Sequence, residues 1–268
     1  MLFAQITDPH VRRPGDRLVG RVDTPGFLER AVAGLNALDP RPDFVLVTGD
    51  LVDAGSQAEY GVLRDLLQHL RMPSYLALGN HDGREAFRAS FPDLGYWPAD
   101  RAFVQYALEL DALRVLVLDT LDQGRSSGAL CQTRLDWLAD RLAEDRRTPT
   151  VVAMHHPPVP VGMPGMDGVR LLEGAERLAG LIQASANVER VLAGHLHRSV
   201  TVRFAGTVLD VMPGTAHQVH YDPEGTAPLS LTLEPPMLQL HRLVPGAGLV
   251  SHKLPVGAFD GPYPFRGG

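Results

Sequence analysis

The segment Ser74-Tyr75-Leu76-Ala77-Leu78-Gly79-Asn80-His81-Asp82 joins a short apolar run directly to a group of polar side chains. Its first five residues predict a buried strand, and the glycine lets the backbone turn sharply where that strand ends. The same arrangement of an apolar run followed by polar residues occurs at four other places. These are Asp8-Pro9-His10, Gly49-Asp50, His155-His156 and Gly194-His195-Leu196-His197. Because ligand sites of open α/β sheets gather at the carboxyl ends of strands, we expect all five groups to meet.

Short apolar runs alternate with helical periodicity through the first 198 residues, which predicts an α/β core. Strands are expected at residues 2–7, 44–47, 74–78, 103–108, 115–118, 151–154 and 190–193. One helix is predicted to begin with Thr24 as N-cap and Pro25 in its first position. A second follows a capping box formed by Ser56 and Glu59, and two more are expected around residues 135–142 and 171–184.

The pattern changes at about residue 199, after which no helical stretch is predicted. Strand-like runs cover residues 200–204, 208–212, 229–233 and 237–243, separated by turn residues. Residues 255–268 are rich in glycine and proline, so we expect them to lie extended over the body of the protein. With no repeat and no long linker, the chain is predicted to form one domain, with a core of residues 1–198 and a β-rich part of residues 199–268.

Composition excludes several classes of protein. The 268 residues include 25 Lys and Arg against 31 Asp and Glu, a formal charge of −6, which argues against a surface for nucleic-acid polymers or anionic lipid. The one cysteine, Cys131, excludes an internal disulfide and a cysteine-based zinc site, and fits a reducing compartment. No apolar run approaches the length of a membrane span or of a signal peptide, so we expect a cytoplasmic protein without membrane contact.

The clustered side chains are those that bind borderline or hard divalent cations. The candidate donors are Asp8, His10, Asp50, Asn80, His155, His195 and His197. Carboxylate, imidazole and amide ligands suit Mn, Fe, Co or Zn. Seven donors exceed what one ion takes from protein, whereas a bridging Asp50 would give each of two ions four contacts. Two divalent ions carry more positive charge than the two aspartates carry negative charge. The ion pair would therefore attract a phosphate ester and supply a hydroxide to attack phosphorus.

Neighbouring residues have less determined roles. His81 adjoins Asn80 and is expected on the substrate side, where it would donate a proton to the leaving oxygen, with Asp82 orienting it. His156 either ends its strand or supports the ligands. Arg84 is a candidate for a phosphate contact, although an exposed position at a helix start is the more common role of such a residue. His69, His241 and His252 are assigned no role.

Taken in order, these motifs resemble those of the calcineurin-like binuclear metallophosphoesterases. The His-His-Pro-Pro run at 155–158 and the segment 213–219 resemble the bacterial class III cyclic-nucleotide phosphodiesterases and glycerophosphodiesterases in particular. The resemblance implies a four-layer α/β/β/α sandwich whose second sheet is completed by residues 199–268. It implies one metal held by Asp8, His10, Asp50 and His197, and a second held by Asp50, Asn80, His155 and His195. It also places His217 near the substrate and gives the C-terminal part a role in dimer contacts and a cap.

The expected function is hydrolysis of small phosphodiesters, either cyclic nucleotides or glycerophosphodiesters, by a metal-bound hydroxide with two divalent or mixed-valence ions. A phosphomonoesterase or phosphoprotein phosphatase would use the same metal pair. A scaffold that binds partners without catalysis is a third reading, but such scaffolds are expected to have lost ligands, and all seven donors are present here. The resemblance further implies a homodimer or a larger homo-oligomer.

Overall fold

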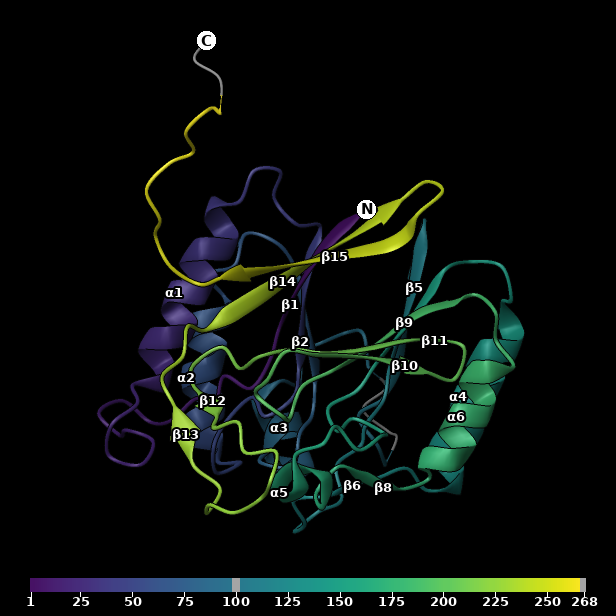
Figure 1. Ribbon diagram of the computed structural model, residues 1–268, viewed down its shortest axis with the longest axis horizontal. Coiled ribbons are helices and arrows are strands. Elements are labelled where there is room, and N and C mark those ends of the chain that lie inside the picture. Colours follow the sequence, from purple (N-terminus) through teal and green to yellow (C-terminus); the bar gives the residue numbers. More distant parts are fainter. Residues whose placement is uncertain (98–101, 266–268) are drawn as a thin grey trace.

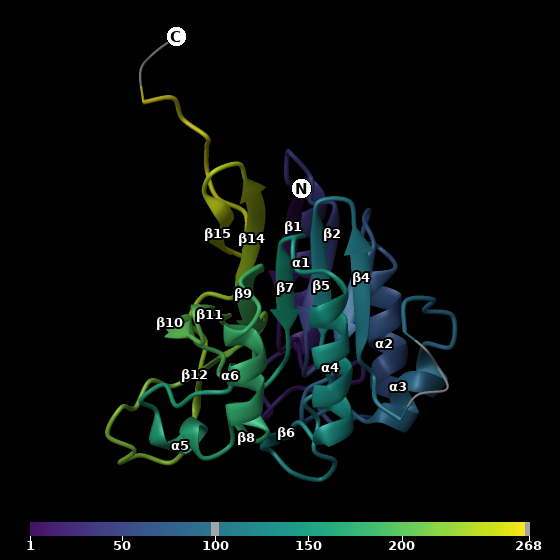
Figure 2. The same cartoon turned by 90° about the vertical axis from the view of Figure 1, so that its right-hand side faces the viewer.

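Two central β-sheets lie between two layers of helices in the computed structural model, which describes residues 1–97 and 102–265 (Figure 1). The first sheet has the strand order β15-β14-β1-β2-β3, and the second has the order β10-β11-β9-β7-β5-β4. Figure 1 shows α1, α2 and α3 on the side of the first sheet and α4 and α6 on the side of the second, and Figure 2 looks onto the side of α4 and α6. The predicted four-layer α/β/β/α architecture is therefore confirmed.

Three parallel strands and two antiparallel ones form the first sheet. Its strands are β1 (Leu2–Ile6), β2 (Phe44–Thr48), β3 (Ser74–Ala77), β14 (Met237–Val244) and β15 (Gly248–Pro255). The helices are α1 (Thr24–Ala37), α2 (Gln57–Leu67) and the short α3 (Arg84–Ser90), which was not predicted. The capping box of Ser56 and Glu59 is confirmed. The N-cap of α1 is Asp23 rather than Thr24, because the Asp23 carboxylate accepts a hydrogen bond from the amide of Gly26.

The second sheet is parallel at its centre and antiparallel at both edges. Its strands are β4 (Tyr106–Leu110), β5 (Leu113–Val117), β7 (Thr150–Ala153), β9 (Val188–Ala193), β10 (Val200–Phe204) and β11 (Thr207–Val211). Helix α4 (Gln132–Glu144) lies where it was expected. The helix predicted for residues 171–184 begins only at α6 (Ala175–Gln183). Residues before it form strand β8 (Leu171–Glu173), paired with β6 (Gly128–Ala129), and Gly174 turns the chain with a φ of +83°.

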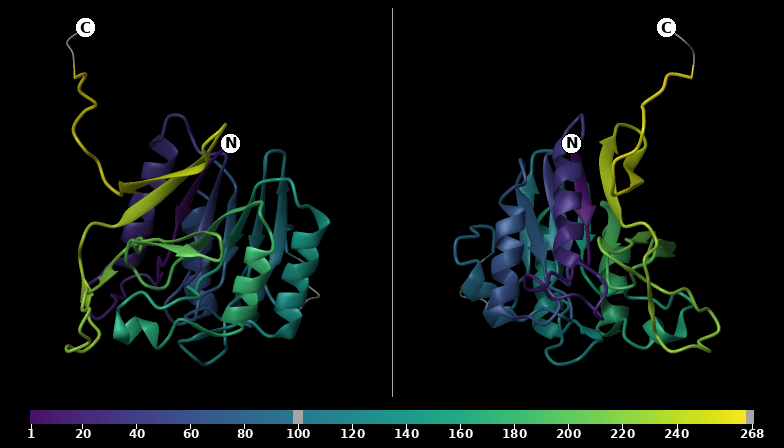
Figure 3. Two further views of the ribbon diagram at one scale, coloured as in Figure 1. Left: turned by 45° about the vertical axis from the view of Figure 1, so that its right-hand side comes forward. Right: turned by 90° about the vertical axis from the view of Figure 1, so that its left-hand side faces the viewer.

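The C-terminal part contributes strands to both sheets, and not only to the second sheet as expected. Strands β10 and β11 join that sheet, but β14 and β15 extend the first sheet beside β1, and β15 was not predicted. The run at residues 229–233 gives only β13 (Leu231–Thr232), which pairs with β12 (Gln218–Val219). The described residues beyond 257 are exposed and lead away from the body (Figure 3), because they lack the apolar contacts needed to hold them against it. The expectation that they lie over the body is therefore wrong.

Alternating side chains of the second sheet fill two different cores. Val115 and Val117 on β5 face the core between the sheets, whereas Leu116 and Leu118 pack in the core beneath α4 and α6. Burial of both faces explains why the strands are continuous apolar runs. No helix within the described ranges is long and apolar enough to cross a membrane.

Polar groups also tie the two sheets together. Asp210 on β11 is almost fully buried, and it accepts hydrogen bonds from Gln239 on β14 and Lys253 on β15. Gln5 on β1 donates to the hydroxyl of Thr48 and to the carbonyl of Ala193 at the end of β9. These bonds align the carboxyl ends of the parallel strands from both sheets at one edge of the molecule, the lower edge in Figure 1.

Candidate metal centre

The structure brings all five polar groups together at the carboxyl ends of β1, β2, β3, β7 and β9. Backbone bonds connect the turns directly, since the amide of Asp8 donates to the carbonyl of Gly49 at 3.1 Å and that of His10 to Asp50 at 3.0 Å. The amide of His195 reaches across to both carboxylate oxygens of Asp8, at 3.2 and 3.1 Å. Residues separated by nearly two hundred positions thus share one framework of hydrogen bonds.

One group of candidate ligand atoms comes from Asp8, His10, Asp50 and His197, all of them buried, with the atoms within 4.8 Å of one another. The Nε2 atoms of His10 and His197 face each other at 3.1 Å. His197 Nε2 lies 3.3 Å from Asp8 Oδ1, and His10 Nε2 lies 3.5 Å from Asp50 Oδ2. Four donor atoms directed at one small volume form a geometry that a cation can fill.

A second group lies on the other side of Asp50. His155 Nε2 is 3.3 Å from Asp50 Oδ2 and 3.3 Å from Asn80 Oδ1. The ring of His195 packs edge-to-face against that of His155, with 5.1 Å between the ring centroids. The Asp50 carboxylate therefore lies between the two groups, in the position from which it can contact both.

Backbone carbonyls set which imidazole nitrogen faces the centre. His155 Nδ1 donates to the carbonyl of Thr48 at 2.8 Å, and His197 Nδ1 donates to the carbonyl of His217 at 2.9 Å. With Nδ1 occupied in this way, Nε2 of each ring faces the carboxylates and is the atom that could bind a metal after losing its proton. This geometry favours His155 over His156 as the residue that contacts Asp50.

Unusual backbone conformations place several of these side chains. Asp8, His10, Asp50, His195 and His197 all have positive φ, between 43° and 71°. Such conformations cost non-glycine residues of order 1–3 kcal/mol each and concentrate at functional sites. The strain is held by the surrounding hydrogen bonds, so the fold itself keeps the donors directed inwards.

Glycines are needed here more for close approach than for turning. Gly49 has a φ of +97°, as expected for a sharp turn, but Gly79 and Gly194 do not have positive φ. A Cβ on Gly79 would overlap the carboxylate and amide of Asp50, and one on Gly194 would overlap Thr7 and Asp8. Because glycine has no side chain, the ends of neighbouring strands can approach each other closely at positions 79 and 194.

Burial and mutual attraction together set the protonation states of the side chains in this centre. Burial opposes ionisation of Asp8 and Asp50, yet the facing His197 and His155 hold the pKa of each carboxyl below its usual range. Burial also opposes a charge on His155, but Asp50 and Asp8 raise its pKa to about 9. Burial lowers the pKa of His195 to about 3. The carboxylates are thus ionised and His195 is neutral at physiological pH, which are the states that bind metal, whereas His155 must give up a proton when metal binds.

The residues fit a metal pair on structural grounds. His195 Nε2 is buried and has no hydrogen-bond partner among the described residues. The Nε2 atoms of His10 and His197 also face each other at 3.1 Å, and at most one of them can carry the proton of a hydrogen bond between them. A buried polar atom without a partner costs free energy unless a ligand binds it. Cations between these nitrogens and the carboxylates would satisfy all of them.

His81 lies at the rim of the centre, but Asp82 does not orient it. Asp82 is buried and accepts hydrogen bonds from the amides of Leu51 and Gly79 and from the hydroxyl of Tyr60. It fixes the two loops that carry Asp50 and Asn80. The expected role of Asp82 is therefore wrong.

Asp53, which sequence reasoning missed, holds His81 instead. Its carbonyl lies 2.7 Å from His81 Nδ1, and its carboxylate faces His10 Nδ1 at 3.4 Å and pairs with Arg12. Its spacing of three residues after Asp50 was the only signal in the sequence, and that spacing alone does not distinguish it from an exposed loop residue.

Three further candidates are also placed. His156 is fully buried, with Nδ1 2.8 Å from the hydroxyl of Thr120 and its ring 4.6 Å from that of His195, so it packs behind the centre. His217 lies against His197, with 4.4 Å between ring centroids, and faces the cavity. Arg84 makes a two-pronged ion pair with Asp119, at 2.7 and 2.8 Å, and is therefore not directed at a phosphate.

A cavity of about 300 Å³ opens directly over the ligand atoms. Its floor is polar and its walls are mostly apolar. The floor is formed by His10, Asp50, Asp53, Asn80, His81, His195, His197 and His217. This space is suited to a small ligand with an anionic group at the metals.

Comparisons with known proteins agree with this geometry. The family model of the calcineurin-like phosphoesterases matches residues 1–199. The chain is 35% identical over 267 residues to the glycerophosphodiester phosphodiesterase GpdQ of Enterobacter lignolyticus, covering 98% of this chain and 94% of that protein. It is 34% identical over 222 residues to the cAMP/cGMP dual specificity phosphodiesterase MT0825 of Mycobacterium tuberculosis, covering 81% and 68%. A dimetal phosphatase from Danio rerio shares the fold, with a TM-score of 0.66, 13% identity and coverage of 96% and 99%.

Proposed function

The chain belongs to the calcineurin-like phosphoesterase family, and from this we propose that it hydrolyses small phosphodiesters at the centre around Asp50. It is a metal-dependent phosphodiesterase of the class that includes the glycerophosphodiester and cyclic-nucleotide enzymes to which it is similar over most of its length. The observation that carries the proposal is the position of Asp50, whose Oδ2 lies 3.5 Å from His10 Nε2 of one group and 3.3 Å from His155 Nε2 of the other.

Each side of Asp50 is proposed to hold one divalent ion, with mixed valence as an alternative state of the pair. Asp8, His10, Asp50 and His197 would hold the first, and Asp50, Asn80, His155 and His195 the second. The nitrogen and oxygen donors suit Mn, Fe, Co or Zn. When bound, such ions supply the water-derived nucleophile and compensate negative charge on the phosphoryl oxygens.

The protein residues supply positioning and a proton. His81 is proposed as the catalytic acid: its side chain is 40% exposed at the rim of the centre, and Nδ1 is held by the carbonyl of Asp53, so Nε2 is free to face the substrate. Burial opposes a charge on His81, but nearby Asp50 raises its pKa above the ordinary value, which favours the form that donates a proton. His217 is proposed to contact the substrate, and His156 and Asp82 to support the ligands.

The C-terminal residues are proposed to contribute to a homodimer or larger homo-oligomer and to a cap over the site. Support for the oligomer comes from the aromatic side chains of Phe259, Tyr263 and Phe265, which are exposed among the described residues. The division into a core of residues 1–198 and a β-rich part of residues 199–268 is kept as part of this proposal.

Replacement of one ligand tests the function. We expect Asp50→Ala and Asn80→Ala to lower turnover of bis(p-nitrophenyl) phosphate by about a thousandfold or more, because each removes a donor that positions the metals. Asn36→Ala on α1 is the matched control, since Asn36 bonds only to the backbone of His69 and Arg71 in the described contacts.

Metal content and substrate choice separate the alternatives. Two ions per chain after reconstitution and loss of turnover with a chelator are expected. Full activity in a metal-stripped sample would contradict the mechanism, and fewer than two ions with no turnover would favour a binding scaffold. Faster hydrolysis of p-nitrophenyl phosphate than of the diester would favour a monoesterase.

A further inference from the structure

One wall of the cavity over the metal centre is built almost entirely from apolar side chains. It is formed by Leu18, Met166, Val169, Val219, Leu229 and Leu231. These residues come from three segments that are distant in the sequence, namely the loop after β1, the region of α5 (Pro164–Asp167) and the pair β12–β13. Figure 1 shows α5, β12 and β13 together at the end of the molecule where the parallel strands end.

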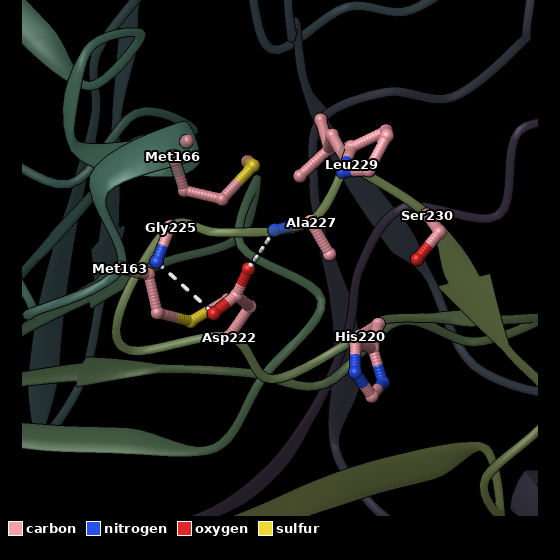
Figure 4. Close-up of a pocket in the computed structure, with 10 residues that line it drawn as sticks. Met163, Met166, His220, Asp222, Gly225, Ala227, Leu229 and Ser230 are labelled. Carbon is pink, nitrogen blue, oxygen red and sulfur yellow. Dashed lines mark hydrogen bonds between the residues drawn. The ribbon is translucent and has the colours of Figure 1, made fainter.

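Hydrogen bonds hold this wall in place. The Asp222 carboxylate accepts bonds from the amides of Gly225 and Ala227, at 3.0 and 2.8 Å, and so fixes the loop that carries Leu229 (Figure 4). The Asp167 carboxylate accepts three further bonds, from the amides of residues 161–163, which fix α5. The two parts lie close together, because a Cβ placed on Gly165 would lie 3.6 Å from Leu229 Cδ1. The wall is therefore a formed surface.

The same surface leaves large apolar groups in water. Leu229 is 64% exposed, and Val19, beside it at the outer edge of the wall, is 65% exposed. Val19 also has a φ of +46°, a strained conformation for a β-branched residue. Exposed apolar side chains gathered beside a cavity are typical of a ligand-binding surface.

The opposite side of His81 has a different chemistry. A second hollow there is lined by Gln123 and Arg125 together with glycines, and shares Asp53, Asn80, His81 and Ser126 with the main cavity. An acyclic phosphodiester bound at the metal centre has two separate ester arms, which leave phosphorus in different directions. One direction meets the apolar wall and the other meets this polar hollow.

Building on the proposed function, we propose that the wall of Leu18, Met166, Val169, Val219, Leu229 and Leu231 binds an apolar ester arm. The substrate is then an unsymmetrical phosphodiester with one alkyl or aryl arm on this wall and one polar arm beside Gln123 and Arg125. The apolar arm is retained on the phosphate product, and the polar arm leaves beside His81. The wall thus selects substrates by the size of the retained apolar group.

Glyceryl ethyl phosphate and glyceryl pentyl phosphate test this directly, because they share a polar glycerol leaving group and differ only in the retained apolar arm. A fully buried methylene changes binding about fourfold, and an arm on an open wall is about half buried, so we expect roughly twofold per methylene. The wild-type enzyme should therefore show a kcat/KM about eightfold higher for the pentyl ester. Leu229→Ser should reduce this ratio to about threefold or less.

Leu233→Ser is the matched control, because Leu233 is similarly exposed, at 60%, and does not line the cavity. It should keep the wild-type ratio. A ratio near one in the wild-type enzyme, with the ethyl ester still hydrolysed, overturns the inference and leaves the proposed function intact. Hydrolysis of neither ester would instead count against the proposed function. A ratio near one combined with a Leu229→Ser variant that sediments as a smaller species also overturns the inference, and assigns the wall to contact between copies of the chain.

Discussion

Gly194 shows at the scale of one residue how tightly the centre is assembled. A Cβ at this position would overlap the hydroxyl of Thr7, lie 2.7 Å from Asp8 Oδ2 and lie 3.0 Å from the carbonyl of Thr48. Three strand ends meet there, and none of these neighbours is the mobile end of a long side chain. The site therefore requires a glycine at position 194 as much as it requires the candidate ligands themselves.

We expect Gly194→Ala to destabilise the protein by about 2 kcal/mol and to lower activity sharply, because the added carbon must push Asp8 away from the centre. Urea denaturation and hydrolysis of bis(p-nitrophenyl) phosphate measure the two effects. Gly180→Ala is the control, since Gly180 lies inside α6 with no described atom near its Cβ position. That change should stabilise by about 0.5–1 kcal/mol and leave activity unchanged. Equal effects of the two substitutions would contradict the argument.

At the scale of an element, the hairpin of β10 and β11 carries a turn that its sequence does not optimise. Phe204 pairs with Thr207, so the loop has two residues, Ala205 and Gly206, with φ of 47° and 89°. Two positive φ values are those of a type I′ turn, which favours Asn followed by Gly. Alanine pays a conformational cost there that asparagine largely avoids.

Ala205→Asn is accordingly expected to raise the free energy of unfolding by about 1 kcal/mol, measured by the midpoint of urea denaturation. Gly206→Ala provides the opposite control, since nothing described lies within 4 Å of its Cβ position but its φ disfavours any side chain. It should lower stability by about the same amount. A decrease for Ala205→Asn would show that the turn is not of this type.

At the scale of the whole molecule, His241 belongs to a chain of bonds that joins the two sheets. It lies fully buried on β14, with Nε2 3.2 Å from Gln5 Oε1 and Nδ1 2.8 Å from the hydroxyl of Ser251. Gln5 in turn donates to the carbonyl of Ala193 in the second sheet. Burial lowers the pKa of His241 to about 3, so the folded protein keeps this imidazole neutral.

In the unfolded chain the pKa of this imidazole is about 6.5, so between pH 6.5 and pH 3 the unfolded state binds a proton that the folded state does not. The free energy of unfolding is therefore highest above pH 6.5 and decreases as the pH falls towards 3. By pH 5 the loss from this residue is about 2 kcal/mol. We expect His241→Gln to remove that part of the acid destabilisation, measured by urea denaturation at pH 8 and pH 5. Wild-type protein and variant losing equal stability between these pH values would contradict the assignment.

The candidate site was predictable because its residues stand directly after apolar runs. Asp8, Asp50, Asn80 and His195 each follow a strand, and parallel strands of one domain must end at a common edge. The roles of Asp53 and Asp82 were not predictable, since they depend on which loop atoms lie within hydrogen-bond distance. The helices α3 and α5 were missed because short helices depend on tertiary contacts more than on periodicity.

The residue types and their positions relative to the strands determined the α/β architecture, the family and the set of candidate donor atoms, because burial pattern and ligand chemistry are local properties of the chain. Only the tertiary structure decided that β14 and β15 join the first sheet, that Asp53 rather than Asp82 holds His81, and that an apolar wall faces the metal centre. Those features arise from contacts between segments far apart in the sequence, and their geometry is set by how the whole core packs.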